Sequence, residues 1–334
     1  MTAFCCDLSV IGAGSYGTAL AVAVSSKGLK VILWDRVPEI AALMQERRVN
    51  AQFLDGITLP PTLEVTADLQ RAVESSQVIL LVIPSHAFKE VLTEIVPWLG
   101  PEHCVAWAAK GLDFATGSLL SEIAQQTVPF QIPLAALSGP TFARELASGM
   151  PTAISVAGTS GEFTASLCKL MHTPTFRIYE SSDLIGLQLG GAVKNVIAIG
   201  AGLSDGLGYG ANARTALITR GLAEMVRLGV AKGASERSFM GLSGLGDLIL
   251  TCTDDKSRNR RFGRMLGQGI APEEALRSIG QVVEGYKMTV VVRRLAQQYG
   301  VQMPICCELY EVLYNGKNGR AAARTLLSRE LTVE

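Results

Sequence analysis

One lysine stands in the middle of a long run of apolar and glycine residues, QLGGAVKNVIAIGAGL at 188–203. An unpaired buried ammonium is costly, and each glycine in a helix costs about 1 kcal/mol relative to alanine. On a helix, Gly190 and Lys194 share one face, with Gly191 and Asn195 beside it. Such small residues leave room for a ligand or another backbone. A desolvated Lys194 there could exchange protons at a low pKa, or it could reach past a packed helix to water.

A second group of candidate residues lies in the arginine-rich segment TCTDDKSRNRRFGRM. Ser257 is suited to be the N-cap of a helix whose first two turns are crowded with arginines. These are Arg258, Arg260, Arg261 and Arg264. Cations are disfavoured there unless an anion neutralises them, and Arg258 and Asn259 beside free N–H groups suit a phosphate. The same residues could also form a solvated basic face.

Two further polar side chains adjoin apolar segments. GLSGLGDLILT places Asp247 in a glycine-rich turn, where its carboxylate could orient a lysine, bond a substrate hydroxyl or cap a helix. Lys110 follows the apolar strand CVAWAA, and ligands of parallel sheets bind beyond the carboxyl ends of the strands. Lys110 is therefore a candidate for holding an anion or a carbonyl, with an ordinary surface lysine as the alternative. We expect His86, after another strand, to face solvent or start a helix.

The segment GAGSYG contains a GxGxxG pattern made by Gly12, Gly14 and Gly17. It follows an apolar strand and opens a helix, which is the context of a dinucleotide-binding turn. Gly12 would permit the tight turn, Gly14 would let the backbone approach a pyrophosphate, and Gly17 would let helix and strand pack closely. The next strand ends in Asp35, which suits the ribose hydroxyl of NAD, and Arg36, which suits the 2′-phosphate of NADP. The choice between NAD and NADP stays open.

The elements that carry these residues divide the chain into two predicted domains. Apolar strands alternate with helices up to about residue 182, which predicts a parallel sheet covered on both faces, of the Rossmann-type doubly wound α/β class. After that point we expect only helices, near 183–204, 212–232, 257–268, 285–299 and 304–315. The predicted domains are a dinucleotide-binding domain, 1–182, and an all-helical substrate-binding and catalytic domain, 183–334.

Composition excludes several functional classes. The 334 residues carry a formal net charge of zero, which argues against a nucleic-acid-binding protein. No apolar run of membrane-spanning length without charge and no signal peptide are evident, so we expect no membrane insertion. The seven cysteines include no CxxC pattern and the three histidines are scattered, which favours reduced thiols and no metal site.

The chain resembles the bacterial NAD(P)-dependent sn-glycerol-3-phosphate dehydrogenase family nearly from end to end. The motifs that carry the resemblance are VIGAGSYGTALA, AAKGLD, LSGPTFARELA, GGAVKNVIAIGAGLSDGLGYGANARTALITRG, GLSGLGDLILTCTDDKSRNRRFG and GQVVEGY. It implies reversible reduction of dihydroxyacetone phosphate to glycerol 3-phosphate, which supplies glycerophospholipid synthesis. It also implies a cytoplasmic enzyme that forms a homodimer.

The resemblance also implies roles for particular residues. Lys194 would be the proton donor and acceptor at the C2 oxygen, with Asp247 and Lys110 as its catalytic neighbours. The implied substrate-binding residues are Lys110, Gly139, Thr141, Lys194, Asn195, Asp247, Ser257, Arg258 and Asn259. The implied cofactor-binding residues beyond the three glycines and Asp35 are Ser15, Tyr16, Arg36, Lys110, Ala143, Arg258, Val282 and Glu284.

Two other functions fit part of the sequence. A β-hydroxyacid dehydrogenase also pairs a Rossmann domain with a helical domain and a helix lysine, but it gives no reason for the arginine-rich segment. A non-catalytic dinucleotide-sensing module would leave both Lys194 and that segment without a role.

Overall fold

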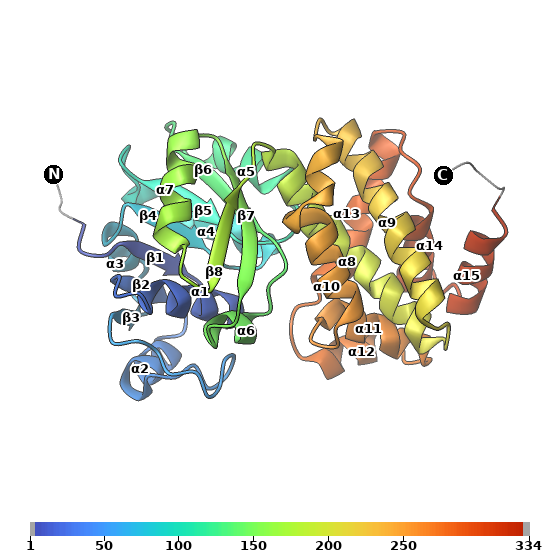
Figure 1. Ribbon diagram of the computed structural model, residues 1–334, viewed down its shortest axis with the longest axis horizontal. Coiled ribbons are helices and arrows are strands. Elements are labelled where there is room, and N and C mark those ends of the chain that lie inside the picture. Colours follow the sequence, from blue (N-terminus) through green and yellow to red (C-terminus); the bar gives the residue numbers. More distant parts are fainter. Residues whose placement is uncertain (1–3, 330–334) are drawn as a thin grey trace. The chain divides into compact units, whose positions relative to one another are not determined.

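The computed structural model describes residues 4–329, so the outermost residues of both predicted domains lie outside the described part of the chain. Two compact units are present (Figure 1). The first consists of the described residues up to Ala109 together with Ser118–Leu187, and the second consists of Lys110–Gly117 together with the described residues from Gln188 onward. The loop after the fifth strand, which begins with Lys110, therefore belongs to the second unit, although the predicted boundary placed it in the first domain.

The first unit is built on an eight-stranded sheet in the order β3-β2-β1-β4-β5-β6-β7-β8. The strands are β1 (Leu8–Ile11), β2 (Val31–Trp34), β3 (Leu63–Thr66), β4 (Val78–Leu81), β5 (Cys104–Trp107), β6 (Leu134–Ser138), β7 (Thr152–Gly158) and β8 (Phe176–Glu180). Its helices are α1 (Ser15–Ser25), α2 (Pro38–Arg47), α3 (Leu69–Glu74), α4 (Phe88–Ile95), α5 (Leu120–Thr127), α6 (Ala143–Ala147) and α7 (Gly161–Met171).

Side chains alternate across this sheet and build one core on each face. Leu8 and Val10 of β1 pack in the same core as Leu20 of α1 and Leu167 of α7. Ile11, on the opposite face, packs in a second core with α3, α4 and α5. The mostly parallel, doubly wound sheet confirms the predicted fold class.

One strand pairing differs from the expected parallel sheet, because β7 runs antiparallel to β6. The connection between them carries only the five-residue helix α6, which packs against α1. The chain therefore enters β7 from the edge at which it left β6. Strands β3 and β8 were not expected from the sequence, and both lie at the ends of the strand order, where a strand needs no continuous apolar run.

The second unit contains helices, as predicted. They are α8 (Leu184–Gly206, which enters this unit at Gln188), α9 (Ala211–Ala231), α10 (Asp247–Thr253), α11 (Arg258–Gly267), α12 (Pro272–Ile279), α13 (Glu284–Gln298), α14 (Pro304–Tyr314) and α15 (Gly319–Leu327). A π-helical turn, Leu242–Gly246, precedes α10. Helices α8, α9, α11, α13 and α14 match the five predicted segments, whereas α10, α12 and α15 were missed.

Helix α8 is the core of this unit, with every residue from Gln188 to Ser204 buried. Within the described residues it is the one helix long and apolar enough to cross a membrane, and 89% of its most apolar window is buried inside the protein. A buried core helix of a soluble protein has this same composition.

The glycines of α8 and α11 let the two helix backbones touch. A Cβ at Gly263 of α11 would overlap the carbonyl oxygen of Ile199 and lie 2.9 Å from the amide nitrogen of Leu203. Cβ atoms at Gly202 and Gly206 of α8 would likewise overlap the α11 backbone. The small residues Gly202 and Gly206 of α8 therefore admit the backbone of α11.

The backbone contact at Gly263 predicts a large cost for one added methyl group. Gly263→Ala should lower the free energy of unfolding by about 1–3 kcal/mol, because neither backbone can move away without disturbing its helix. Gly161→Ala at the start of α7 is the matched control, since its Cβ would meet nothing within 4 Å. Denaturant midpoints of both variants measure the difference, and equal midpoints would contradict the close contact.

Candidate active site

Close backbone packing at one end of α8 brings the predicted catalytic groups together. A Cβ at Gly190 would lie 2.6 Å from the carbonyl oxygen of Ser243, so glycine lets the π-helical turn approach α8. That turn leads directly into Asp247, the first residue of α10. Lys194 lies one helical turn after Gly190 on α8. The side chains of Lys194 and Asp247 therefore meet beside this contact.

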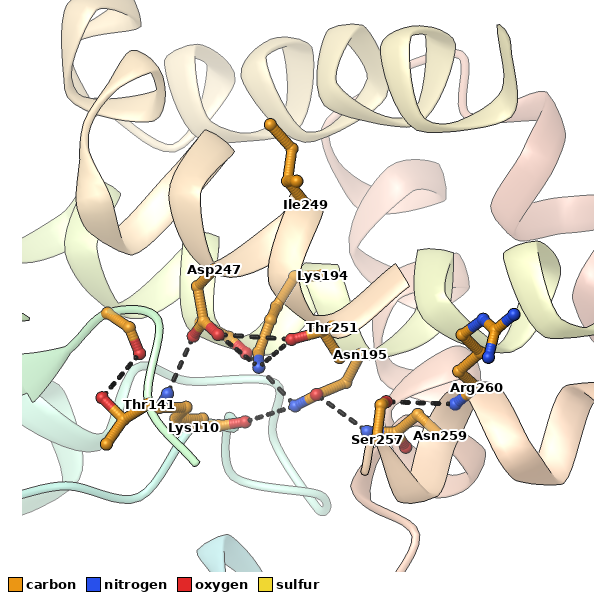
Figure 2. A network of polar contacts seen from close by, with 12 residues as sticks. Lys110, Thr141, Lys194, Asn195, Asp247, Ile249, Thr251, Ser257, Asn259 and Arg260 are labelled. Carbon is orange, nitrogen blue, oxygen red and sulfur yellow. Dashed lines mark hydrogen bonds and ion pairs between the residues drawn. The ribbon is translucent and has the colours of Figure 1, made fainter. Parts of the chain in front are cut away.

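Asp247 is shared by two lysines (Figure 2). Its Oδ2 accepts a hydrogen bond from Lys110 Nζ at 2.8 Å, and its Oδ1 accepts one from Lys194 Nζ at 2.9 Å. The side chains of Lys194 and Asp247 are only 8% and 2% exposed. With both lysines protonated, this triad of Lys110, Lys194 and Asp247 carries one excess positive charge, which favours an anion or a developing alkoxide nearby.

The environment shifts both central pKa values. Burial lowers the pKa of Lys194 to about 8, against the opposing effect of the Asp247 carboxylate. Burial raises the pKa of Asp247, but the two neighbouring ammonium groups outweigh it and hold that pKa below its ordinary value. Lys194 can therefore gain and lose a proton near neutral pH while Asp247 stays ionised.

Thr251 completes the surroundings of Lys194, and sequence reasoning missed it. Its Oγ1 accepts a hydrogen bond from Lys194 Nζ at 2.8 Å and lies 3.2 Å from Asp247 Oδ1. Thr251 follows Asp247 by four residues on α10, so the two share one helix face. The four-residue spacing from Asp247 is the signal that could have identified Thr251, but the apolar residues around it hide this signal in the sequence.

A chain of buried amides extends from the triad. Asn195 Nδ2 donates to the carbonyl oxygens of Gly191 and Lys110, each at 3.2 Å. Asn259 Nδ2 donates to Asn195 Oδ1 at 2.9 Å, and the backbone N–H of Gly285 donates to Asn259 Oδ1 at 3.0 Å. These bonds tie the Lys110 loop to α8, α11 and α13, so Asn195 and Asn259 hold the framework of the site.

The chain itself neutralises part of the arginine-rich segment. Arg260, which is buried, donates to Asp205 at 2.6 Å and also pairs with Asp255. Arg264 pairs with Asp255 at 3.1 Å, although the Asp255 side chain is largely exposed. The crowding of arginines therefore does not by itself require a bound anion. The sequence did not reveal Asp205 as a partner because 55 residues separate it from Arg260.

The residues predicted to bind phosphate lie at the start of α11. Ser257 is its N-cap, and the Ser257 side chain accepts the Arg260 N–H at 3.2 Å. Arg258 is the first residue of α11, and it remains accessible to solvent although burial of its guanidinium lowers its pKa. The N–H groups of this first turn and the Arg258 guanidinium form a suitable place for a phosphate.

In the first unit, the glycine-rich turn fits a dinucleotide. Gly12 has φ +117°, and a Cβ there would lie 2.5 Å from the carbonyl oxygen of Val82. A Cβ at Gly17 would overlap the carbonyl of Gly12, whereas a Cβ at Gly14 would meet nothing within 4 Å. Only the middle glycine faces open space, and it directly precedes the N-terminus of α1, where pyrophosphate oxygens are stabilised.

The remaining predicted cofactor residues lie on several elements. Ser15 and Tyr16 begin α1, and Asp35 follows β2, where its Oδ1 accepts the Val37 N–H at 2.9 Å. Arg36 is exposed, so its position does not decide between NAD and NADP. Ala143 begins α6, Glu284 begins α13, and Val282 is 40% exposed before α13.

Two predicted substrate residues belong to the first unit. Gly139 and Thr141 follow β6, and Thr141 Oγ1 donates to the Gly139 carbonyl at 3.3 Å. Gly139 has φ +157°, and a Cβ there would lie 2.8 Å from Ile154 Cα, so this turn needs glycine. His86 is exposed in the short helix Ser85–Ala87, in agreement with its expected solvent-facing position.

The described part of the chain contains neither a disulfide nor a group of side chains placed to bind a metal. All seven cysteines are free thiols. Residues 4–329 hold no group of three or more His, Cys, Asp or Glu side chains placed to bind a metal ion.

Family models and sequence relatives place the chain in one enzyme family. Residues 7–164 match the model for the N-terminus of NAD-dependent glycerol-3-phosphate dehydrogenase, and residues 183–324 match the model for its C-terminus. The chain is 58% identical over 324 residues to the glycerol-3-phosphate dehydrogenase [NAD(P)+] of Escherichia coli K12, which covers 97% of this chain and 96% of that protein.

Solved structures lead to the same family. The glycerol-3-phosphate dehydrogenase of Coxiella burnetii is 42% identical with a TM-score of 0.94, covering 98% of this chain and all of that one. A yeast glycerol-3-phosphate dehydrogenase is 26% identical with a TM-score of 0.83, covering 96% of this chain and 99% of that one. D-mandelate dehydrogenase, at 15% identity and a TM-score of 0.60, shares the fold alone.

The shared carboxylate predicts how Lys194 responds when that charge is removed. In Asp247→Asn, burial and the Lys110 charge remain, and both lower the pKa of Lys194, so it should fall below its value of about 8. The lost ion pairs should also lower the denaturant midpoint. NMR titration of the Lys194 side-chain amine measures the pKa, with the exposed Glu94→Gln as the control. An unchanged pKa would show that Asp247 does not set the charge of Lys194.

Proposed function

The chain belongs to the NAD-dependent glycerol-3-phosphate dehydrogenase family, and we propose that it interconverts dihydroxyacetone phosphate and sn-glycerol 3-phosphate with NAD or NADP. The observation that carries the catalytic assignment is Lys194, a buried lysine whose pKa is lowered to about 8 and which is held by Asp247 and Thr251. The first unit acts as the dinucleotide-binding domain, and the helical second unit supplies the catalytic lysine.

In the reduction, protonated Lys194 donates a hydrogen bond to the C2 carbonyl oxygen and then gives its proton to the forming alkoxide. The nicotinamide cofactor, when bound, supplies the hydride in this direction and accepts it in the reverse. Two of the three N–H groups of Lys194 donate to Asp247 and Thr251, which aims the third at the substrate oxygen. Asp247 keeps the ammonium in place, and Lys110 adds a second positive charge beside the developing oxyanion.

The phosphate of the substrate binds at the start of α11. Arg258 forms the ion pair, and the Ser257 hydroxyl is able to donate while its oxygen accepts the Arg260 N–H. Asn259 has one amide N–H committed to Asn195, so its second is the one that reaches a phosphate oxygen. Binding energy gained at this distant group fixes the orientation of C2.

The other assignments rest on the family resemblance. Gly139 and Thr141 would contact the substrate, and Ser15, Tyr16, Arg36, Ala143, Val282 and Glu284 would contact the cofactor. The protein would be a cytoplasmic homodimer that supplies glycerol 3-phosphate for glycerophospholipid synthesis.

The proton-transfer role of Lys194 predicts opposite pH profiles for the two directions. Reduction requires protonated Lys194, so kcat should fall as pH rises through about 8, whereas oxidation requires the neutral amine and should gain over the same range. Lys194→Ala should lower kcat by about 10²–10⁴-fold while the Kd of the dinucleotide stays within about twofold. Profiles that run in the same direction would rule out Lys194 as the group that exchanges the proton.

The phosphate site predicts strict substrate selection. Initial rates with NADH and with NADPH should be high for dihydroxyacetone phosphate and very low for unphosphorylated dihydroxyacetone and for 3-keto acids. Arg258→Ala should raise KM for dihydroxyacetone phosphate about tenfold or more, with a smaller effect on kcat. Faster turnover of keto acids would favour the β-hydroxyacid dehydrogenase alternative, and dinucleotide binding without turnover of any of them would favour a sensing module.

A further inference from the structure

Asn50 is a buried polar side chain that the proposed mechanism does not use. It lies in the loop between α2 and β3 and is 1% exposed. Its Nδ2 donates to the carbonyl oxygen of Ala13 and to Thr18 Oγ1, each at 2.8 Å, and its Oδ1 accepts the Phe53 N–H at 3.2 Å. The reversed amide would place two acceptor oxygens 2.8 Å apart at Ala13, so the bonding pattern fixes the orientation.

The loop that carries Asn50 is itself firmly held. Arg48 takes a left-handed conformation with φ 56°, and its guanidinium donates to the carbonyl oxygens of Leu63, at 2.6 Å, and Pro60. The Leu59 N–H donates to the Arg48 carbonyl at 2.8 Å, and Val49 pairs with Thr58 in a β-bridge. These bonds close the loop at its base and fix the backbone at Asn50.

The partner of Asn50 lies inside the glycine-rich turn. The Ala13 carbonyl also accepts a hydrogen bond from Thr18 Oγ1 at 3.2 Å, so Ala13, Thr18 and Asn50 form a closed set of three hydrogen bonds. In a trans peptide the C=O and the following N–H point to opposite sides. With the Ala13 oxygen held inward, the Gly14 N–H points outward, next to the open space that a Cβ at Gly14 would occupy.

We propose that Asn50 and Thr18 are positioning residues that lock the Ala13–Gly14 peptide with its N–H toward the pyrophosphate of the bound dinucleotide. The inference rests on the proposed use of this turn for dinucleotide binding. Glycine lacks the Cβ that restricts backbone rotation, so the openness that admits the phosphate also makes this peptide easy to flip. A flipped peptide would present the Ala13 oxygen to the phosphate, and like charges would repel. The two hydrogen bonds to that oxygen oppose the flip and preorganise the turn.

The test is direct measurement of the Kd of NADH and of NADPH by titration calorimetry on the full-length protein. Asn50→Ala should weaken binding about tenfold or more, and Thr18→Val, which removes the hydroxyl at nearly constant volume, should weaken it severalfold. Thr18→Ser keeps the hydroxyl and should stay within about twofold of the unaltered protein. Gln52→Ala, an exposed position in the same loop, is the matched control.

A second readout separates positioning from general damage to the fold. At saturating dinucleotide, kcat and the KM for dihydroxyacetone phosphate should change less than threefold in Asn50→Ala, about the effect of one weak hydrogen bond. If that variant does not fold, the Thr18→Val and Thr18→Ser pair still decides the matter.

Several results would overturn the inference. The first is an unchanged dinucleotide Kd in Asn50→Ala and Thr18→Val while the unaltered protein binds tightly. The second is an equal loss of dinucleotide affinity in Thr18→Ser and Thr18→Val. The third is a fall in kcat of Asn50→Ala that matches the rise in its Kd. An unaltered protein that binds neither dinucleotide would overturn the proposed function and this inference with it.

Discussion

The candidate site depends on one buried carboxylate that serves two ammonium groups. Without Asp247, Lys110 and Lys194 would repel each other in surroundings that already disfavour charge. With it, the pair is held together, yet burial still lowers the pKa of Lys194 to about 8. Burial without Asp247 would leave Lys194 as a neutral amine that has no proton to give. If Asp247 cancelled the effect of burial completely, Lys194 would be an ordinary ammonium group that does not release its proton. Proton exchange near neutral pH requires this intermediate balance.

That balance depends in turn on how closely backbones approach in the second unit. Gly190 lets the π-helical turn reach α8, and Gly285 lets α13 reach the carbonyl of Asn195. A hydrogen-bonded ion pair tolerates errors of only a few tenths of an ångström, and backbone contacts are stiffer than contacts between flexible side chains. Close backbone contact also shapes the glycine-rich turn of the first unit. Backbone atoms occupy the positions where a Cβ of Gly12 or Gly17 would lie, whereas the position at Gly14 is open.

Much of this architecture could be predicted from local sequence. The start of helix α11 is where the sequence predicts it, because Ser257 is an N-cap residue directly before the arginine-rich turn. What failed depends on tertiary contact. Strand β8 was missed because only one of its five residues is buried, so it has no apolar pattern. The antiparallel direction of β7 depends on the packing of α6 against α1, which no local pattern shows. For Asp247 the sequence offered three roles, and only the packing of α10 on α8 shows that it pairs with lysine. Asp205 was missed because no local pattern links it to Arg260.

The chain does not divide at one point into its two units. Lys110–Gly117 leaves the β-sheet unit and belongs to the helical unit, and the chain then returns to build β6, β7 and β8. The family match to the helical part starts only at residue 183, so a gene fragment cut there would encode Lys194 and Asp247 without Lys110. In such a fragment the charges of Lys194 and Asp247 would cancel, and the excess positive charge of the triad would be lost. Two separated stretches of the gene therefore encode the residues that give this site its positive charge. A recombination event that exchanged only the helical part would combine Lys110 from one ancestor with Lys194 and Asp247 from another.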